Sequence, residues 1–427
     1  MKSIIIKMLS HQLIRGSLII VLGSTIVNIG NYVFHLLTGR LLGPTQYGVL
    51  ESIISSLYIL GIIPLALGIT VVKFVSQFPG SENKEEARVF FRWLNVKLLV
   101  LGSVISLVLL FLVPIWSSFL KLTDNLPLIF AILTFPFLLL ATSARSFLQG
   151  ILNFFGYSVS VIFEVVVKII LAVIFIFLGW SVSGAVGAML LGLVVAYLIT
   201  LYLLREINSP KKVKSEFKQG KKFLKYSLPV TISILSITSL YTVDIILVKH
   251  FFNAFDAGIY AAVSILGKII YFAPASLVSV MFPLVSSRQA RGEKYHGVFW
   301  LTFVLVAACS ALLSSIYFFF PKLMINILFG VKYLSGASIL YWFAIFISLY
   351  ALCNTLLNFY LSLGKTRASL LVFVGAFLQI ILIFVWHADL LAVVIDSIIA
   401  SSILLASLLL YYPYAAKKKL KPSLLKS

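Results

Sequence analysis

The chain has 427 residues, of which 61% are hydrophobic and only 11% are charged. With a mean hydropathy of +1.10, it has too little polar surface to cover a water-soluble globule. A net charge of +21 would suit a nucleic-acid-binding protein, but no segment is long enough to form a soluble domain with a basic face. Composition therefore predicts an integral membrane protein without a nucleic-acid partner.

Twelve apolar stretches are long enough to cross a bilayer as helices, each of which needs about 20 residues. Their apolar runs are continuous rather than alternating, which predicts helices and not barrel strands. The expected fold is an all-α membrane protein with about twelve spans, at 17–38, 44–72, 94–116, 126–148, 158–180, 183–204, 227–248, 258–285, 298–320, 337–361, 369–387 and 390–412.

The first stretch carries a polar stripe. Lipid does not tolerate such a stripe, so it must face a neighbouring helix or water. A seam of interhelical hydrogen bonds would satisfy it, but its length favours a hydrated cavity. The polar residues recur at steps of three and four and so share one helix face: Ser24, Asn28, Asn31, His35 and Thr38.

The turn after this stretch is repeated. Residues Gly39–Leu50 have a degenerate copy at Lys249–Tyr260, at a register of 210 residues in which Gly48 falls on Gly258. The chain therefore contains two copies of one membrane unit. Internal repeats with a binding site at their interface are typical of secondary transporters, which makes transport the first hypothesis.

Prolines recur in the same register, Pro64 in the second stretch and Pro274 in the eighth. A proline inside a helix removes a backbone hydrogen bond and favours a kink. Both residues are candidate hinges for alternating access, and static bends are the alternative.

Two arginines lie near helix ends, Arg40 after the first stretch and Arg145 in the fourth. They could form a polar rim where a charged headgroup enters. A lone arginine at a helix end can instead be a snorkelling anchor.

Ionisable residues inside the spans are candidate functional groups. Glu164 and Lys168 are four residues apart, so they can pair on one helix. Lys268 has no acid nearby in sequence and is the better candidate to meet an anionic ligand, unless Asp244 or Glu51 neutralises it across the bundle.

The chain divides near its middle, at a basic polar segment. The predicted parts are a six-helix lobe over 1–208, a linker over 209–226, and a second six-helix lobe with a basic tail over 227–427. The seventh stretch opens the second lobe with its own polar residues, Thr231 to Asp244, which predicts a cavity between the halves.

The distribution of lysine and arginine predicts the orientation of the chain in the membrane. Of the 34 basic residues, 27 lie on the side of both termini and five on the other side. By the positive-inside rule both termini are cytoplasmic, as an even number of spans requires, in a multi-pass protein of the plasma or inner membrane.

Two segments carry a family resemblance. Thr38–Gly48, followed by a long apolar helix, resembles the first-loop signature of the polysaccharide-biosynthesis flippases of the multidrug/oligosaccharidyl-lipid/polysaccharide (MOP) exporter superfamily. Val243–Leu247, leading to Ala257–Ala262, is similar to that family's seventh-to-eighth helix segment. The resemblance implies two six-helix lobes with pseudo-two-fold symmetry, as in MATE transporters, around a cavity that opens alternately to either side.

The resemblance also implies a function, namely transfer of lipid-linked oligosaccharides from the cytoplasmic to the outer leaflet. The expected partners are that cargo and membrane lipids, with a polysaccharide polymerase or glycosyltransferases acting beside a monomeric protein. Coupling to a proton or sodium gradient would need an embedded carboxylate, with Asp244 the first choice and Glu51 the second. The cargo would be held by cations and sugar-facing donors: Lys268, Lys168, Arg145, Arg40, Asn28, Asn31 and His35.

Two rivals are weaker. Drug extruders of the superfamily often carry a carboxylate on the first helix, and the 17–38 stretch has none, so a cation-coupled drug antiporter is the alternative rather than the first choice. A membrane glycosyltransferase would need acids in an external loop or an attached nucleotide-sugar domain. The sequence offers no metal-ligand spacing, phosphate loop or nucleophile-base set, so we expect no catalytic residue, metal or cofactor.

Overall fold

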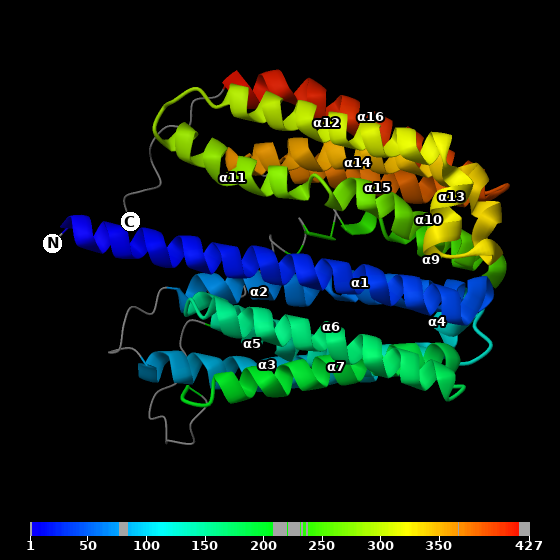
Figure 1. Ribbon diagram of the computed structural model, residues 1–427, viewed down its shortest axis with the longest axis horizontal. Coiled ribbons are helices and arrows are strands. Elements are labelled where there is room, and N and C mark those ends of the chain that lie inside the picture. Colours follow the sequence, from blue (N-terminus) through cyan, green and yellow to red (C-terminus); the bar gives the residue numbers. More distant parts are fainter. Residues whose placement is uncertain are drawn as a thin grey trace. The chain divides into compact units, whose positions relative to one another are not determined.

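The protein is all-helical in the part of the chain that the computed structural model describes (Figure 1). The chain forms two compact units. The first comprises Met1–Ile234 with Asn253–Gly258, and the second Leu235–Phe252 with Ile259–Ser427. The described residues are 2–76, 84–207, 220, 231, 234–235, 238–365 and 367–417. The predicted linker, 209–226, lies outside them apart from Gly220.

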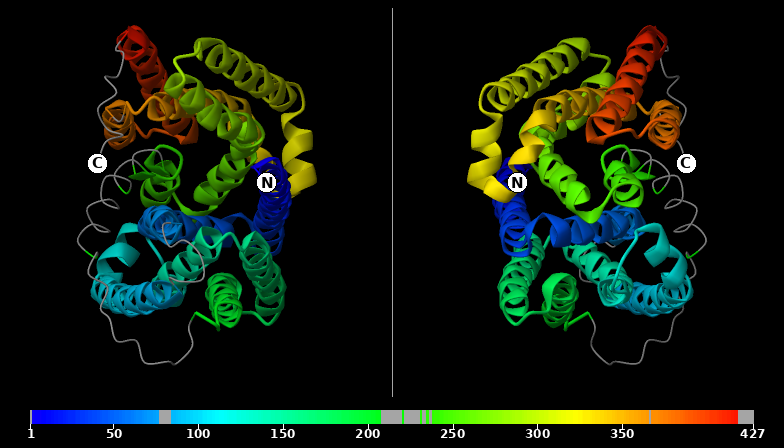
Figure 2. Two further views of the ribbon diagram at one scale, coloured as in Figure 1. Left: turned by 90° about the vertical axis from the view of Figure 1, so that its left-hand side faces the viewer. Right: turned by 90° about the vertical axis from the view of Figure 1, so that its right-hand side faces the viewer.

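In the first unit, helix α1 (Lys2–Leu60) lies alongside α6 (Phe154–Phe177), which packs against α7 (Ser181–Leu203) (Figures 1 and 2). Helix α1 breaks at Gly43, whose φ of 72° and ψ of 172° are readily adopted only by glycine. The predicted turn is therefore present. The remaining helices of this unit are α2 (Ile62–Val75), α3 (Lys84–Phe111), α4 (Val113–Phe119) and α5 (Leu126–Gly150).

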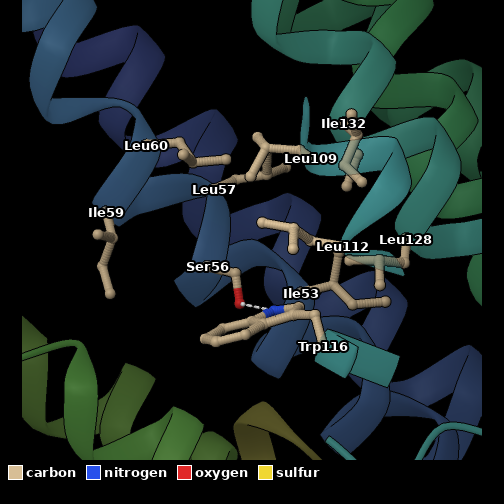
Figure 3. Close-up of a pocket in the computed structure, with 11 residues that line it drawn as sticks. Ile53, Ser56, Leu57, Ile59, Leu60, Leu109, Leu112, Trp116, Leu128 and Ile132 are labelled. Carbon is tan, nitrogen blue, oxygen red and sulfur yellow. Dashed lines mark hydrogen bonds between the residues drawn. The ribbon is translucent and has the colours of Figure 1, made fainter. Parts of the chain in front are cut away.

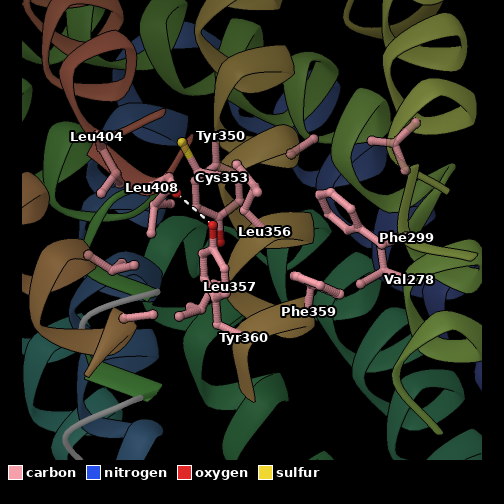
Figure 4. Packing of buried hydrophobic residues seen from close by; sticks show 14 of the residues in the cluster. Val278, Phe299, Tyr350, Cys353, Leu356, Leu357, Phe359, Tyr360, Leu404 and Leu408 are labelled. Carbon is pink, nitrogen blue, oxygen red and sulfur yellow. Dashed lines mark hydrogen bonds between the residues drawn. The ribbon is translucent and has the colours of Figure 1, made fainter. Parts of the chain in front are cut away.

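The second unit has a large apolar core around α14 (Ala337–Ser362), part of which is shown in Figure 4. Phe299 and Phe359 lie with ring centroids 4.2 Å apart, and the buried Tyr360 hydroxyl donates a 2.6 Å hydrogen bond to the carbonyl oxygen of Leu408. The other elements are α9 (Val243–Phe251), α10 (Ala254–Phe272), which begins in the first unit, α11 (Ala275–Ala290), α12 (His296–Phe319), α13 (Pro321–Leu328), the 3-10 helix η2 (Val331–Gly336), α15 (Ala368–Val385) and α16 (Leu390–Lys417).

Ten segments of the described residues are long and apolar enough to cross a membrane, whereas the sequence predicts twelve. The first two predicted stretches are counted together as Leu22–Val75 because helical turns resume directly after Gly43, although the break there separates two helices. Eight of the 22 residues of the seventh stretch lie outside the described residues, and its described helix α9 has only 9 residues. The prediction of an all-helical membrane protein is confirmed.

Both repeated prolines lie at a helix interruption. Pro64 is in the first turn of α2, just after the break that separates it from α1. Pro274 lies between the end of α10 and the start of α11. A proline has no N–H to donate, so it is tolerated where a helix begins. The predicted bends are present in each unit, and their role as hinges stays a prediction.

Gly48 and Gly258, equivalent in the repeat, pack against backbone within the first unit. A Cβ atom on Gly48 would collide with the carbonyl oxygen of Ala254, and one on Gly258 with the carbonyl oxygen of Pro44. Pro44 and Ala254 are themselves equivalent in the 210-residue register, so the contact is reciprocal. Only glycine allows the repeated turns to approach this closely.

Replacing Gly258 with alanine should therefore destabilise the protein, by about 1–3 kcal/mol, because the obstructing atoms belong to backbone that cannot rotate away. Gly187→Ala is the matched control, since the nearest atoms to its Cβ would be ring carbons of Phe130 at 3.7 Å. Thermal unfolding of the purified protein in detergent measures both variants. Unfolding of the Gly258 variant at the parent temperature would contradict the close approach.

Candidate functional site

A buried acid–histidine pair joins the two halves of α1. His35 Nδ1 lies 2.6 Å from Glu51 Oε1, and the two residues are 7% and 1% exposed. The hydroxyl of Tyr47 lies 3.5 Å from the same nitrogen. The break at Gly43 brings these residues together, because it lets the second half of α1 turn back toward the first. The embedded acid Glu51 thus has a partner that was predicted as a separate, sugar-facing donor.

Lys168 reaches from α6 to α1. Its ammonium donates a 2.7 Å hydrogen bond to Asn31 Oδ1 and lies 4.6 Å from the ring centroid of Phe34. Its charge also interacts with Glu164 and Glu51. A buried ammonium is stabilised by such partners, so Asn31 and Lys168, both predicted to bind cargo, contact each other.

Arg145 on α5 holds the other end of this polar region. Its guanidinium lies 2.6 Å from Glu164 Oε2, and it donates to the Ser160 hydroxyl at 3.0 Å and to the Ser160 carbonyl at 3.1 Å. Ser160 also bonds with Thr200 of α7 at 2.8 Å. The predicted interaction of Glu164 with Lys168 is present as a charge interaction. Arg145, distant in sequence, approaches Glu164 from a neighbouring helix and adds the closer ion pair.

The residues of the predicted polar stripe on α1 differ in their exposure along the helix. Asn28 is exposed, Asn31 is half-buried, and His35 and Thr38 are buried. Arg40 is exposed near the break. The first unit thus gathers Asn31, His35, Arg145 and Lys168 into one region and leaves Asn28 and Arg40 on its surface.

The second unit contains a buried polar chain that crosses four helices. The Tyr260 hydroxyl of α10 donates a 2.8 Å hydrogen bond to Asp244 Oδ2 of α9, and Ser397 of α16 lies near the same hydroxyl. Gln379 of α15 donates to the Ser397 hydroxyl at 2.9 Å. Asp244 is fully buried, at 0% exposed.

Three buried oxygen atoms on α9, α15 and α16 lack a hydrogen bond of good geometry. Asp244 Oδ1 and Gln379 Oε1 have no hydrogen-bond partner of good geometry in the described part of the chain, and neither has Asp396 Oδ2 of α16. Buried acceptors are normally satisfied, so such atoms can receive a proton or a small hard cation, which prefers oxygen ligands. Among the described residues no three of His, Cys, Asp and Glu gather as a metal site.

Lys268 of α10 belongs to the same region. It is buried, its charge interacts with Asp244, and its ammonium lies 5.4 Å from the ring centroid of Tyr241. Asp244 therefore has one embedded cation and one hydroxyl among its neighbours. The possibility that Asp244 neutralises Lys268 across the bundle agrees with this geometry.

Several members of these clusters were not singled out from the sequence. Ser160 and Thr200 resemble ordinary small polar residues of a span. Gln379 could have been predicted to have a hydrogen-bond partner, because an amide in the middle of an apolar stretch is costly unless it is bonded. Tyr260 lies in the repeated segment, but the repeat alone does not predict which residue its hydroxyl contacts.

Comparison with known proteins agrees with this architecture. The fold is similar to an inward-facing multidrug resistance MATE family transporter of the MOP superfamily, with a TM-score of 0.76, 14% identity, and coverage of 92% of this chain and 96% of that one. It is also similar to the lipid II flippase MurJ in an inward closed conformation, with a TM-score of 0.70, 15% identity, and coverage of 92% and 87%. These likenesses establish the fold.

Sequence comparison identifies the family. An uncharacterized membrane protein of Methanocaldococcus jannaschii is 23% identical over 381 residues, which are 82% of this chain and 85% of the relative. The expected class, a transporter rather than an enzyme, agrees with the family and the fold. The model of the polysaccharide biosynthesis protein family matches residues 13–289, more than half of the chain, and the chain belongs to that family.

Proposed function

We propose that the protein is a flippase that moves a lipid-linked oligosaccharide from the cytoplasmic to the outer leaflet. The membership of the polysaccharide biosynthesis protein family carries this proposal, and a fold shared with a lipid II flippase supports it. Both termini are cytoplasmic in this proposal, the protein acts as a monomer, and glycosyltransferases supply the cargo to a polymerase beyond it.

The coupling cation, a proton or sodium, binds at Asp244. The two embedded acids proposed for this role differ in their surroundings. Glu51 is held by His35 at 2.6 Å and interacts with Lys168, so the first unit supplies its own positive charge. Asp244 accepts a hydrogen bond from the neutral Tyr260 hydroxyl, its other carboxylate oxygen has no hydrogen bond of good geometry among the described residues, and the charge near it is that of Lys268. An incoming cation finds more favourable ligands there.

Lys268 links the cation to the cargo. The ammonium and the coupling cation compete for the negative charge of Asp244. When the cation neutralises that charge, Lys268 loses its counter-ion in a low-dielectric region, where an unpaired charge is costly. A diphosphate group of the cargo then provides the missing negative charge. Cation and cargo binding are favourably coupled by this exchange.

In the first unit, the exposed Asn28 and Arg40 are the foremost candidates to meet the sugar and the diphosphate. Asn31, His35, Arg145 and Lys168 contribute mainly by keeping α1, α5 and α6 together through the contacts described above. The alternative function is a cation-coupled antiporter of small molecules, which the likeness to a multidrug MATE transporter keeps open.

Replacing Lys268 with glutamine should abolish flipping of an anionic lipid while the protein still inserts, because an amide cannot compensate a diphosphate. The test uses proteoliposomes with a fluorescent polyprenyl diphosphate disaccharide, whose sugar becomes accessible to external periodate when flipped. Lys249→Gln, a change of another buried lysine of this unit, is the comparison. Movement of ethidium but not of the disaccharide lipid by the parent protein would support the antiporter instead.

A further inference from the structure

An apolar groove lies within the first unit, between the second half of α1 and helices α3 to α5 (Figure 3). Its volume is about 200 Å³. Its lining includes the buried Leu128, Ala131 and Ile132 of α5, and Leu112, at 43% exposed, is its most exposed residue.

The groove offers no polar atom to a ligand. Its polar side chains, Trp116 and Ser56, bond with each other, because the indole Nε1–H donates to the Ser56 hydroxyl at 3.3 Å. That hydroxyl in turn donates to the carbonyl oxygen of Ser52 at 2.8 Å. Figure 3 shows the Trp116 ring along one side of the groove with this bond at its rim. An occupant therefore gains nothing from a hydroxyl, amide or charge, and must be hydrocarbon.

Most of the groove is built from membrane-crossing segments. Nine of its eleven lining residues belong to such segments on α1, α3 and α5, whereas Leu112 follows α3 directly and Trp116 lies on α4. Ile53 and Leu60 span about 10 Å along α1. The volume equals that of roughly seven water molecules, which is enough for a segment of an alkyl chain but not for a whole lipid.

We propose that the groove binds the acyl chain of a lipid of the surrounding bilayer. A bilayer chain is favoured over the cargo's own polyprenyl tail for two reasons. Bilayer lipid is in large excess over the cargo lipid. A site without polar contacts cannot bind the cargo tail more tightly than an acyl chain by enough to overcome that excess. Glu51 also lies on the face of α1 opposite Ile53, Leu57 and Leu60, about 200° around the helix, so the groove is turned away from the charged cluster.

The bound chain fills space that α1 and α5 leave between them. Without it, the apolar lining would lose contact atoms on one side, as in any empty cavity. The lipid is thus a packing element of the first unit. This inference holds whether the protein moves an oligosaccharide lipid or a small molecule.

Trp116 provides the probe. A variant keeps Trp116 and replaces the other five tryptophans with phenylalanine, and it is reconstituted in phosphatidylcholine vesicles with or without bromine on one acyl chain. Bromine quenches tryptophan fluorescence on contact. Ala131→Phe fills the groove and should remove about half or more of the bromine-dependent quenching. Leu60→Phe, at a half-buried position, serves if the first variant does not fold.

A second reporter separates the groove from bulk lipid. A protein that keeps only Trp180, which is 54% exposed, should be quenched equally with and without Ala131→Phe. Equal quenching of Trp116 in the filled and unfilled proteins would overturn the proposal. Loss of quenching on adding a few mole per cent of unlabelled polyprenyl phosphate would assign the groove to the cargo tail and overturn it as well.

Discussion

Replacing Asp244 with asparagine should abolish ion-coupled transport, with a loss of about 100-fold or more, equivalent to about 3 kcal/mol. The amide retains the shape of the side chain and can still accept the hydrogen bond that Tyr260 donates to Oδ2. Only the negative charge is removed, so the fold should be retained. What disappears is the group for which the coupling cation and Lys268 compete.

The measurement compares flipping of the disaccharide lipid in proteoliposomes with and without an imposed proton or sodium gradient. Asp389→Asn is the matched control, because Asp389 is exposed and its carboxylate accepts the Ala392 N–H at the start of α16, a role that asparagine also fills. A gradient response equal to the parent's in the Asp244 variant would move the coupling site elsewhere, with Glu51 next in order.

Much of the fold could be predicted because membrane helices leave a strong local signal. The continuous apolar runs are set by bilayer thickness, and the break at Gly43 and the interruptions next to Pro64 and Pro274 come from the backbone chemistry of single residues. Each of these features depends on a few neighbours in sequence.

The partners of the embedded charges could not be predicted in this way. Helical spacing favoured Glu164 with Lys168, since residues four apart share a face. The two charges do interact, but the closest partner of Glu164 is Arg145, and Lys168 donates its hydrogen bond to Asn31. These pairs depend on how α1, α5 and α6 rotate against each other, which spacing within one helix does not contain. The same limit applies to Gln379, whose partner Ser397 lies on a different helix.

Each unit joins an acid to a partner at the same sequence separation, but the order and the type of partner differ. His35 and Glu51 are 16 residues apart, as are Asp244 and Tyr260. In the first unit the acid follows the break and its partner is an ionisable imidazole, whereas in the second unit the acid comes first and its partner is a phenol. The phenol carries no positive charge, so the charged group that interacts with Asp244 is Lys268, and this arrangement supports an exchange of Lys268 for a coupling cation at Asp244.

Substitution of Arg145 tests whether this residue stabilises the fold or binds the cargo. Arg145→Ala should lower the free energy of unfolding by about 3–5 kcal/mol, because it leaves the Glu164 carboxylate without its ion-pair partner in a largely buried position. Adding Glu164→Gln removes the stranded charge, so the double variant should recover much of that loss. Thermal unfolding of the four proteins in detergent gives the coupling energy between the two positions.

The same four proteins separate the two roles. If Arg145 acts mainly by holding α5 to α6, the stabilised double variant should also recover flipping of the disaccharide lipid, because the cargo never depended on the guanidinium. If stability returns and flipping does not, while the Glu164→Gln single variant still flips the lipid, Arg145 contacts the diphosphate directly. Equal stability of the single variant and the parent would contradict a stabilising ion pair, because a largely buried carboxylate that loses its closest cation is costly.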